Sequence, residues 1–423
     1  MLTVPVERHR LSNGLRVTLS PDPTAPIVAL NIWYAVGSRN ERAGRTGFAH
    51  LFEHMMFQGS ANVPKNRHFE LVERAGGSLN ASTWFDRTNY YDTVPSHHLE
   101  TVLWLESDRM GWMLPAMTAE KLENQQQVVM NERKERYDNQ PYGDWDERLQ
   151  GMVYPESHPY HHPVIGSMED IGAATLDDVA DFFRTFYVPN NAVLTLAGDF
   201  DPSRGLELVD RYFGEIPSGA PIPPIPGESR IPFAMGRTVR QEVVSDVPLP
   251  RIYLAARVPG ATTPDFHTGE VAATVLGTGR ASRLYRTLVR EKRIAKDVMA
   301  FLFPLETGPA LFLFVITGYP GARPESLEEA LVAEMEDLAA VDSWELERAV
   351  ALTETGLLQE IQRVGARADL LSMFDQYFDD PDRLNTELER IRAVDREQVR
   401  AYARDYLGPD NRAILTYVPE SKT

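Results

Sequence analysis

The chain of 423 residues contains no cysteine, which excludes disulfide bonds, thiolate metal ligands and a cysteine nucleophile. It also has no apolar run of the roughly 18 residues that a membrane-spanning helix requires. The N-terminal segment 1–10 lacks the apolar core of a signal peptide. From these absences we expect a cytoplasmic protein without a membrane partner, or a periplasmic or secreted one if a signal has been removed.

An excess of positive charge is missing as well. Lys and Arg number 43 against 61 Asp and Glu, which gives a formal net charge of −18. Such a charge repels phosphate backbones, so we expect no nucleic-acid partner and a mild preference for cationic substrates. The hydrophobic share of 43% is that of a folded globular protein, and the length favours two domains of about 200 residues each.

Prolines cluster near the middle of the chain, between Glu215 and Pro232. Proline fixes φ and donates no backbone hydrogen bond, so this density opposes helices and central strands and favours an extended, semi-rigid linker. We therefore predict a first domain at 1–215, a linker at 216–236 and a second domain at 237–423.

The two predicted domains are related by an internal repeat. Residues 179–194 align with 399–414 when the sequence is shifted by 220 positions (399 − 179 = 220). Each segment carries a helical pattern, a proline turn and a strand pattern, and Thr175 is the expected N-cap of the first helix. We predict an α+β fold of two homologous domains, each an antiparallel-rich sheet packed with helices. The matched pairs include Val179 with Val399, Phe186 with Tyr406, Pro189 with Pro409 and Asn191 with Asn411.

The first domain contains the pentapeptide HLFEH. At about 100° per residue, His50, Glu53 and His54 fall on one face of a helix. Two imidazoles one helical turn apart can bind a single metal ion, and a carboxylate beside them can act as a general base. The competing interpretation is a solvated helix face with two incidental histidines. The opposite face is apolar and comprises Phe48, Leu51, Phe52, Met55 and Met56.

A hydrolytic zinc site usually has three protein ligands, so a further ligand is expected outside the pentapeptide. Glu132 is the best candidate, because it follows Val128 and Val129 on one side of a predicted helix. A carboxylate on an apolar stripe is costly to bury unless a cation accompanies it. The pattern alone leaves three rivals open, namely Glu123, Glu135 and Asp138.

These motifs resemble the inverzincin family of pitrilysin, insulysin and mitochondrial processing peptidase, and in particular its bacterial short-chain members. The resemblance rests on HLFEH, on the segment 131–134 around Glu132, on 80–83 and on 187–191, and it extends over the whole chain. It implies one Zn²⁺ per chain on His50, His54 and Glu132, with Glu53 as general base.

The resemblance also implies how a substrate is held. Asn80 and Ala81 would bind a peptide backbone as an added strand, inside a chamber enclosed by domains or domain pairs. Seven positions before Glu132 the family often has a second glutamate, and here Gln125 can hydrogen-bond but cannot act as a base.

The predicted second domain departs from the family pattern. Arg290 matches a substrate-binding arginine, although an ion pair at a helix end would also explain it. The tyrosine expected seven residues later is Asp297, which would repel a developing oxyanion. We therefore expect a homologous partner subunit that supplies an intact Arg/Tyr pair in a heterodimer, with a homodimer as the other possibility.

The sequence thus predicts a zinc-dependent endopeptidase that cleaves peptides or unfolded segments. The alternative is a non-catalytic structural subunit of the same fold, although such relatives typically have a damaged HxxEH motif. The histidine-dense run 158–163 is interrupted by prolines and is expected to be a loop without metal. The glycine-containing run 277–281 lacks the lysine of a phosphate loop, so we expect no nucleotide site.

Overall fold

The computed structural model describes residues 3–306 and 308–420. Two compact units can be distinguished: Met1–Arg133 with Pro163–Pro226 and Leu358–Thr386, and Lys134–His162 with Gly227–Leu357 and Glu387–Thr423. We refer to them as unit 1 and unit 2. Each unit takes its sheet from one half of the sequence and also includes a segment from the other half. In the described residues, no helix is long and apolar enough to cross a membrane.

Unit 1 contains a six-stranded sheet in the order β1-β2-β6-β3-β5-β4. Its neighbouring strands are antiparallel except for β2 and β6, which are parallel. β6 is buried along its whole length, so the core of the unit lies on both faces of this strand. The strands are β1 (Glu7–Arg10), β2 (Arg16–Pro21), β3 (Ile27–Tyr34), β4 (Ser78–Thr83), β5 (Thr88–Pro95) and β6 (Ala192–Gly198).

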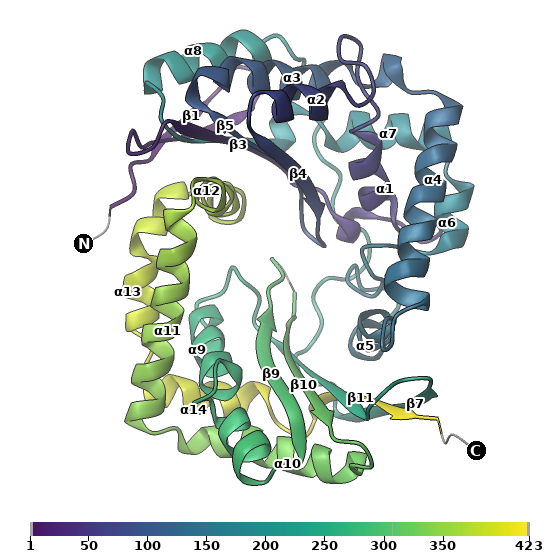
Figure 1. The fold of residues 1–423 in the computed structure, drawn as a ribbon, viewed down its shortest axis with the longest axis vertical. Coiled ribbons are helices and arrows are strands. Elements are labelled where there is room, and N and C mark those ends of the chain that lie inside the picture. The colour runs from purple at the N-terminus through teal and green to yellow at the C-terminus, as the bar shows by residue number, and fades with distance from the viewer. Residues whose placement is uncertain (1–2, 307, 421–423) are drawn as a thin grey trace. The chain divides into compact units, whose positions relative to one another are not determined.

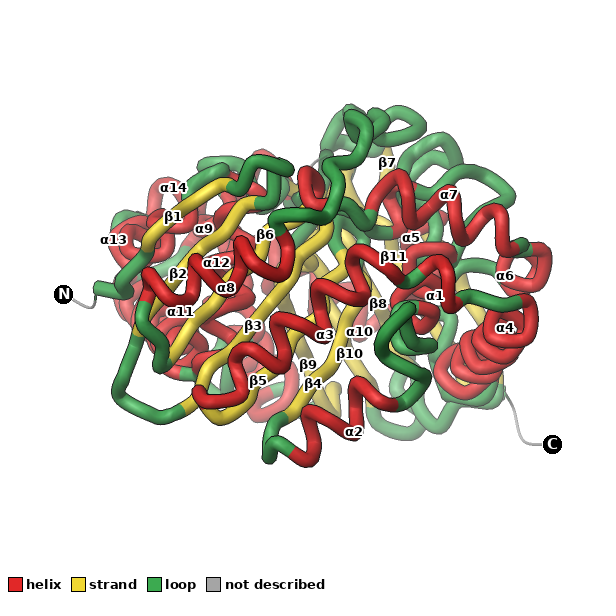
Figure 2. Tube along the Cα trace, turned by 90° about the horizontal axis from the view of Figure 1, so that it is seen from above, coloured by secondary structure: helices red, strands yellow, loops and turns green. Residues whose placement is uncertain are grey.

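Helices cover the two faces of this sheet (Figure 1). α3 contacts β3 and β5, and α8 contacts β2; Figure 2 shows both helices crossing these strands. On the other face, α12 contacts β3 and β6. The helices of unit 1 are α1 (Phe48–Met55), α2 (Arg67–Arg74), α3 (Leu99–Trp112), α4 (Ala119–Arg133), α6 (Met168–Ala173), α7 (Leu176–Phe186), α8 (Pro202–Phe213) and α12 (Val364–Phe378).

α12 comes from the second half of the sequence, and two aspartates bind it to the sheet of unit 1. Asp375 is fully buried and accepts hydrogen bonds from Arg8, Arg16 and Thr18. Asp369 accepts hydrogen bonds from the side chains of three sheet residues, Asn31 (3.1 Å), Trp33 (2.7 Å) and Asn89 (2.8 Å). Charge-assisted hydrogen bonds of this kind fix the helix in one orientation on the strands.

Unit 2 contains a five-stranded sheet in the order β7-β11-β8-β10-β9, again with a single parallel pair, β7 with β11. α5, from the first half of the sequence, contacts β8 and β11, while α10, α14 and α9 cover the other face. The strands are β7 (Arg237–Ser245), β8 (Arg251–Val258), β9 (Ala295–Phe303), β10 (Ala310–Gly318) and β11 (Asn411–Pro419). The helices are α5 (Trp145–Val153), α9 (Phe266–Gly277), α10 (Pro324–Glu336), α13 (Glu387–Arg392) and α14 (Arg396–Tyr406), and α11 (Ser343–Gln362) extends from unit 2 into the segment that belongs to unit 1.

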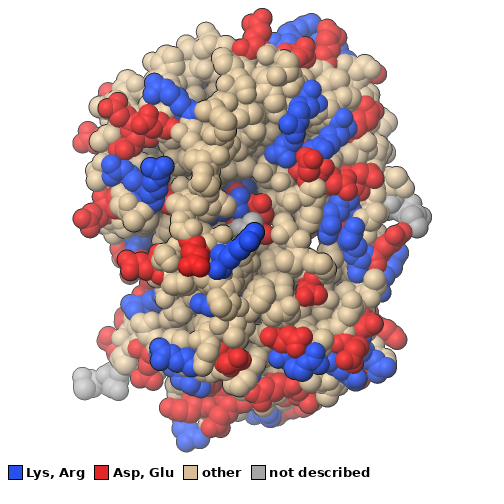
Figure 3. Space-filling view, turned by 180° about the vertical axis from the view of Figure 1, so that it is seen from behind, with Lys and Arg blue, Asp and Glu red and all other residues tan. Residues whose placement is uncertain are grey.

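The predicted α+β class with antiparallel-rich sheets is confirmed, and the single parallel pair makes each sheet mixed. Residues 216–236 contain neither helix nor strand, as the local backbone restriction by proline requires. On the face drawn in Figure 3, Asp and Glu side chains lie among Lys and Arg side chains. The negative net charge is therefore not gathered into one patch on that face.

Candidate metal centre

α1 carries the HLFEH pentapeptide, and its start is fixed by two local features. Gly47, the N-cap, has a φ of 83°, and a Cβ at this position would lie 2.6 Å from the backbone oxygen of Ile165. Only glycine adopts this conformation without strain. The carboxylate of Glu41 accepts hydrogen bonds from the backbone N–H groups of Gly47 (2.9 Å) and Ala49 (2.8 Å), so it satisfies donors that the first turn leaves open.

The apolar face of α1 anchors the helix in unit 1. Phe52 lies with its ring centroid 4.2 Å from that of Tyr187 and 5.6 Å from that of Phe182. Aromatic burial of this kind stabilises a short helix that propensity alone would not hold. The five apolar residues of the predicted face are Phe48, Leu51, Phe52, Met55 and Met56, and each is at most 5% exposed.

The opposite face of α1 meets the C-terminal turn of α4. The Oε2 atom of Glu132 lies 3.7 Å from His50 Nε2 and 3.4 Å from His54 Nε2. Ligands placed tetrahedrally about 2.0–2.1 Å from a zinc ion are roughly 3.4 Å apart, so these three atoms are spaced to share one ion. The side chains are 12%, 23% and 17% exposed in the order His50, His54 and Glu132, so each of the three remains partly accessible to solvent.

The donor set suits zinc, because two imidazole nitrogens and one carboxylate oxygen leave a fourth position open, as in hydrolytic zinc sites. The structure therefore brings together the three residues that the sequence singled out as ligands. Among the described residues, none of the three rivals joins this group. They are Glu123, Glu135 and Asp138.

Glu53 lies between this face of α1 and strand β4. Its Oε2 atom accepts a hydrogen bond from the hydroxyl of Thr83 at 2.5 Å. Burial raises the pKa of Glu53, while the hydrogen bond from Thr83 and the neighbouring His54 oppose the rise. A carboxyl group with a raised pKa is better matched to proton transfer near neutral pH. Thr83 was not predicted as a site residue; the signal was its place two residues after Ala81 on the same strand.

β4 is the last strand of its sheet and pairs with β5 on one side. Asn80 is exposed on this strand, and Ala81 is 7% exposed. The Asn80 side-chain oxygen accepts a hydrogen bond from the N–H of Ala81 (2.9 Å). An edge strand that carries the hydrogen-bond partner of Glu53 can receive an extended peptide next to the metal ligands.

The remaining predicted residues have other surroundings. Gln125 is buried on α4, and its amide donates a hydrogen bond to Asn124 Oδ1 (2.9 Å). In unit 2, Arg290 is exposed in the helical turn Tyr285–Glu291, and no ion pair of it is found in the described part of the chain. Asp297, on β9, accepts a hydrogen bond from Thr317 (2.8 Å).

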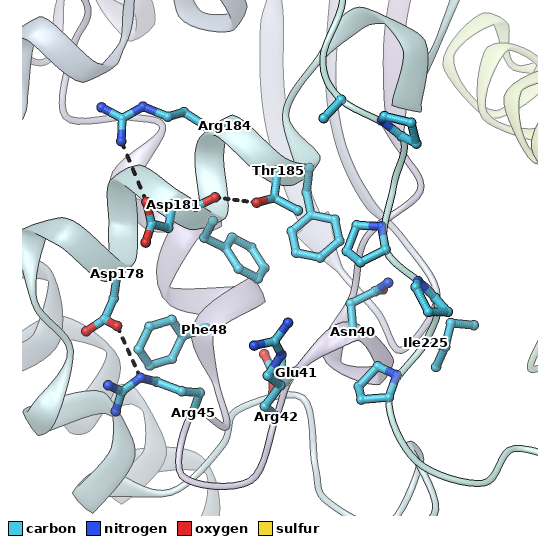
Figure 4. A pocket seen from close by; sticks show the side chains of 17 residues that line it. Asn40, Glu41, Arg42, Arg45, Phe48, Asp178, Asp181, Arg184, Thr185 and Ile225 are labelled. Carbon is cyan, nitrogen blue, oxygen red and sulfur yellow. Dashed lines mark hydrogen bonds and ion pairs between the residues drawn. The ribbon is translucent and has the colours of Figure 1, made fainter.

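A pocket of about 900 Å³ opens beside the first turn of α1 (Figure 4). It is lined by Phe48, by residues of α7 and by the proline-rich segment 220–226. Arg45 pairs with Asp178 at its rim. None of the three metal-binding side chains lines it, so this pocket is separate from the metal centre.

Two family models match the chain. One is described as "Insulinase (Peptidase family M16)" and matches residues 16–154; the other is described as "Peptidase M16 inactive domain" and matches residues 173–353. All residues of the metal centre lie in the first match. The name of the second therefore refers to the part of the chain that lacks the HLFEH motif.

Individual proteins resemble the chain over most of its length. Zinc protease PqqE of Helicobacter pylori is 32% identical over 336 residues, which are 78% of this chain and 74% of that relative. The crystal structure of a protease from Helicobacter pylori has a TM-score of 0.92 and 27% identity, and the match covers 99% of this chain and 100% of that one. A peptidase M16 inactive domain from Pseudomonas fluorescens has a TM-score of 0.86 over 98% of both chains, and at 20% identity it shows the shared fold alone.

Proposed function

Since the chain belongs to the insulinase family of M16 peptidases, as its motifs predicted, we propose that it is a zinc-dependent endopeptidase acting on peptides or unfolded segments. The observation that carries the proposal is the convergence of His50, His54 and Glu132 next to Glu53. A structural subunit would have no need of this arrangement. The relatives' description as zinc proteases supports the same metal.

In this mechanism His50, His54 and Glu132 would hold one zinc ion, which would supply Lewis acidity for the scissile carbonyl group. Glu53 accepts a proton from the attacking water and passes it to the leaving amine. Thr83 holds the carboxylate of Glu53 toward the substrate strand through its hydroxyl group. The free edge of β4 aligns the substrate backbone at Asn80 and Ala81, which selects extended chains more than particular side chains.

The proposal extends to the assembly. Asp297 stands where the family has a tyrosine, so we propose that a homologous subunit with an Arg/Tyr pair completes the site and encloses the substrate in a chamber. In that case the purified chain alone cleaves peptides poorly, and activity rises when the partner is added. Full activity of a monomeric preparation would refute this part of the proposal.

The replacement Glu53→Gln tests the catalytic role itself. Because glutamine cannot accept the proton, turnover should fall by at least about 100-fold, while zinc content, measured by plasma mass spectrometry, stays at the wild-type value. Glu73→Gln, on the exposed end of α2, is a matched control that should leave turnover unchanged. Equal activity of Glu53→Gln and wild type would overturn the assignment of the base.

The alternative is a non-catalytic member of the same fold. The observation in its favour is Asp297, which stands where the family has a substrate-binding tyrosine. The alternative predicts that the zinc-loaded wild type, together with its partner, shows no peptidase activity on unfolded proteins. Detectable turnover that Glu53→Gln abolishes would exclude it.

A further inference from the structure

Unit 1 contains a second cluster of potential metal ligands, formed by residues that the proposed mechanism does not use. His68 comes from α2, Asp92 from β5 and Glu106 from α3. Their side chains are 9%, 1% and 1% exposed, respectively. One possible ligand atom from each lies within 4.8 Å of the other two. Ionisable groups are rarely buried so deeply without a compensating partner.

The distances from His68 to the two carboxylates are those of ligands and not those of hydrogen bonds. His68 Nε2 lies 3.5 Å from Glu106 Oε1 and 3.7 Å from Asp92 Oδ1. These separations are beyond the normal range of an N–H···O hydrogen bond. They match the 3.4 and 3.7 Å that separate the ligand atoms of the first metal centre, and they suit atoms bound to one central ion.

Several polar atoms of the cluster are aimed into it without a hydrogen-bond partner. Within the described residues, this is true of His68 Nε2 and, when Asp92 and Glu106 are both ionised, of the two carboxylate oxygens of Asp92. A proton on either carboxyl group would instead pair Asp92 with Glu106. Leaving a buried polar atom unsatisfied costs folding free energy, and the cost is larger if the group is charged. A bound ion would satisfy all three groups at once, since it accepts one lone pair from each.

The ionisation of the cluster is compatible with metal binding. Burial, followed by the positive charge of Arg109, lowers the pKa of His68 to about 3, so the imidazole is neutral and its nitrogen is available as a ligand. Burial raises the pKa of Asp92 to about 6 and that of Glu106 to about 7, although Arg109 opposes both shifts. A nearby cation would favour the ionised carboxylates.

Arg109 is the group that could argue against a cation. It binds Glu106 through Nε (3.2 Å) and Nη2, and its guanidinium lies over the ring of Tyr90 at 4.3 Å. With two carboxylates and Arg109, the cluster carries one net negative charge without an ion and one net positive charge with a divalent ion. The net charge is therefore equally small in the ion-free and the ion-bound cluster, and it does not exclude a cation. Arg109 instead holds the carboxylate of Glu106 in one orientation through its hydrogen bonds, as residues hydrogen-bonded to a metal ligand commonly do.

We propose that His68, Asp92 and Glu106 form a second cation site, which binds a divalent transition-metal ion such as zinc or manganese. One imidazole and two carboxylates are ligands that these ions accept. The site is structural, because its ligands are buried and come from three elements. It ties α2 to the sheet, and α2 leads directly through Gly76 and Gly77 into β4, the proposed substrate edge. The proposal does not depend on peptidase activity.

The test uses the full-length double variant H50A/H54A, which removes two ligands of the first site and leaves the second cluster untouched. The protein is loaded with Zn²⁺, freed of excess metal by gel filtration and analysed by plasma mass spectrometry. We expect one zinc per chain in the double variant and two in the wild type. An absence of zinc from the double variant would overturn the proposal and leave a proton between Asp92 and Glu106 as the account of the cluster.

A second comparison distinguishes zinc bound at this cluster from zinc bound by surface histidines. Adding His68→Gln to the double variant should abolish the remaining zinc, whereas adding His97→Gln and His98→Gln, at the start of α3, should leave it unchanged. Anomalous diffraction from crystals of the double variant at the zinc absorption edge locates the ion without any change to the cluster. A peak between His68 and Asp92 supports the proposal, and peaks confined to other places refute it.

Discussion

Replacing Asp375 with asparagine should loosen α12 from the sheet of unit 1. Asp375 is fully buried and lies 2.9 Å from Arg8 Nη2, 3.2 Å from Arg16 Nη1 and 2.9 Å from Thr18 Oγ1. Asparagine keeps the volume but removes the negative charge, so two guanidinium groups lose their buried counterion. Breaking such a pair costs about 3–5 kcal/mol. Because the Arg8 side chain is 32% exposed, we expect the lower end of that range, about 3 kcal/mol.

Urea denaturation followed by circular dichroism and tryptophan fluorescence measures this loss. Trp33 donates a hydrogen bond to Asp369 of α12, and its ring lies 5.7 Å from that of Tyr377, so its emission should respond when α12 detaches. The control is Asp379→Asn. Asp379 pairs with Arg8 but is 71% exposed, and exposed pairs contribute about 0–1 kcal/mol. Equal, small losses in the two variants would refute the assignment of Asp375 as the anchor of the helix.

Three further changes have distinct expected results. Thr83→Val should lower kcat about tenfold with KM and zinc content unchanged, because Glu53 loses its hydrogen bond. Thr83→Ser, which keeps the hydroxyl group, should retain the wild-type kcat. A rise in KM alone would contradict this prediction. Glu41→Gln should lower the free energy of unfolding by about 1 kcal/mol, since α1 loses a charged cap, whereas an unchanged urea midpoint would exclude the capping role. His267 lies 2.9 Å from both Glu270 and Glu387; although burial alone would lower its pKa, these carboxylates raise it to about 9 from 6.5. A histidine with a raised pKa stabilises the fold fully below about pH 6.5, and this stabilisation is lost as the pH rises through 9. His267→Gln should therefore lower the free energy of unfolding by about 3 kcal/mol at pH 6 and leave it unchanged above pH 10. A loss that does not depend on pH would contradict the assignment.

Local periodicity was sufficient to predict α1. The spacing of Phe48, Leu51 and Phe52 against His50 and Glu53 depends on 3.6 residues per turn, and the structure buries the apolar set as expected. The N-cap at Thr175 is confirmed for the same reason, since its hydroxyl accepts a hydrogen bond from the N–H of Asp178 three residues later. These features depend on residues that are close in the sequence.

Features that depend on packing were harder to predict. The sequence left Glu132 among several carboxylates, because the choice depends on how α4 meets α1. Thr83 gave no signal of its own beyond its place on the strand. The cluster of His68, Asp92 and Glu106 has no motif, since its members lie on three elements and only the tertiary structure unites them.

The exchanged segments, 134–162 and 358–386, affect how the chain can be divided. Segment 134–162 supplies α5 to the sheet of unit 2, and segment 358–386 supplies α12 to the sheet of unit 1. The two segments begin 224 positions apart (358 − 134 = 224), close to the shift of 220 positions in the sequence repeat. A cut in the proline-rich segment 216–236 would therefore not yield two autonomous halves. Each fragment would lack a helix that covers its own sheet and would carry the helix that the other fragment needs. Co-expressed halves should consequently reassemble by fragment complementation, whereas either half alone should expose an uncovered sheet face and aggregate.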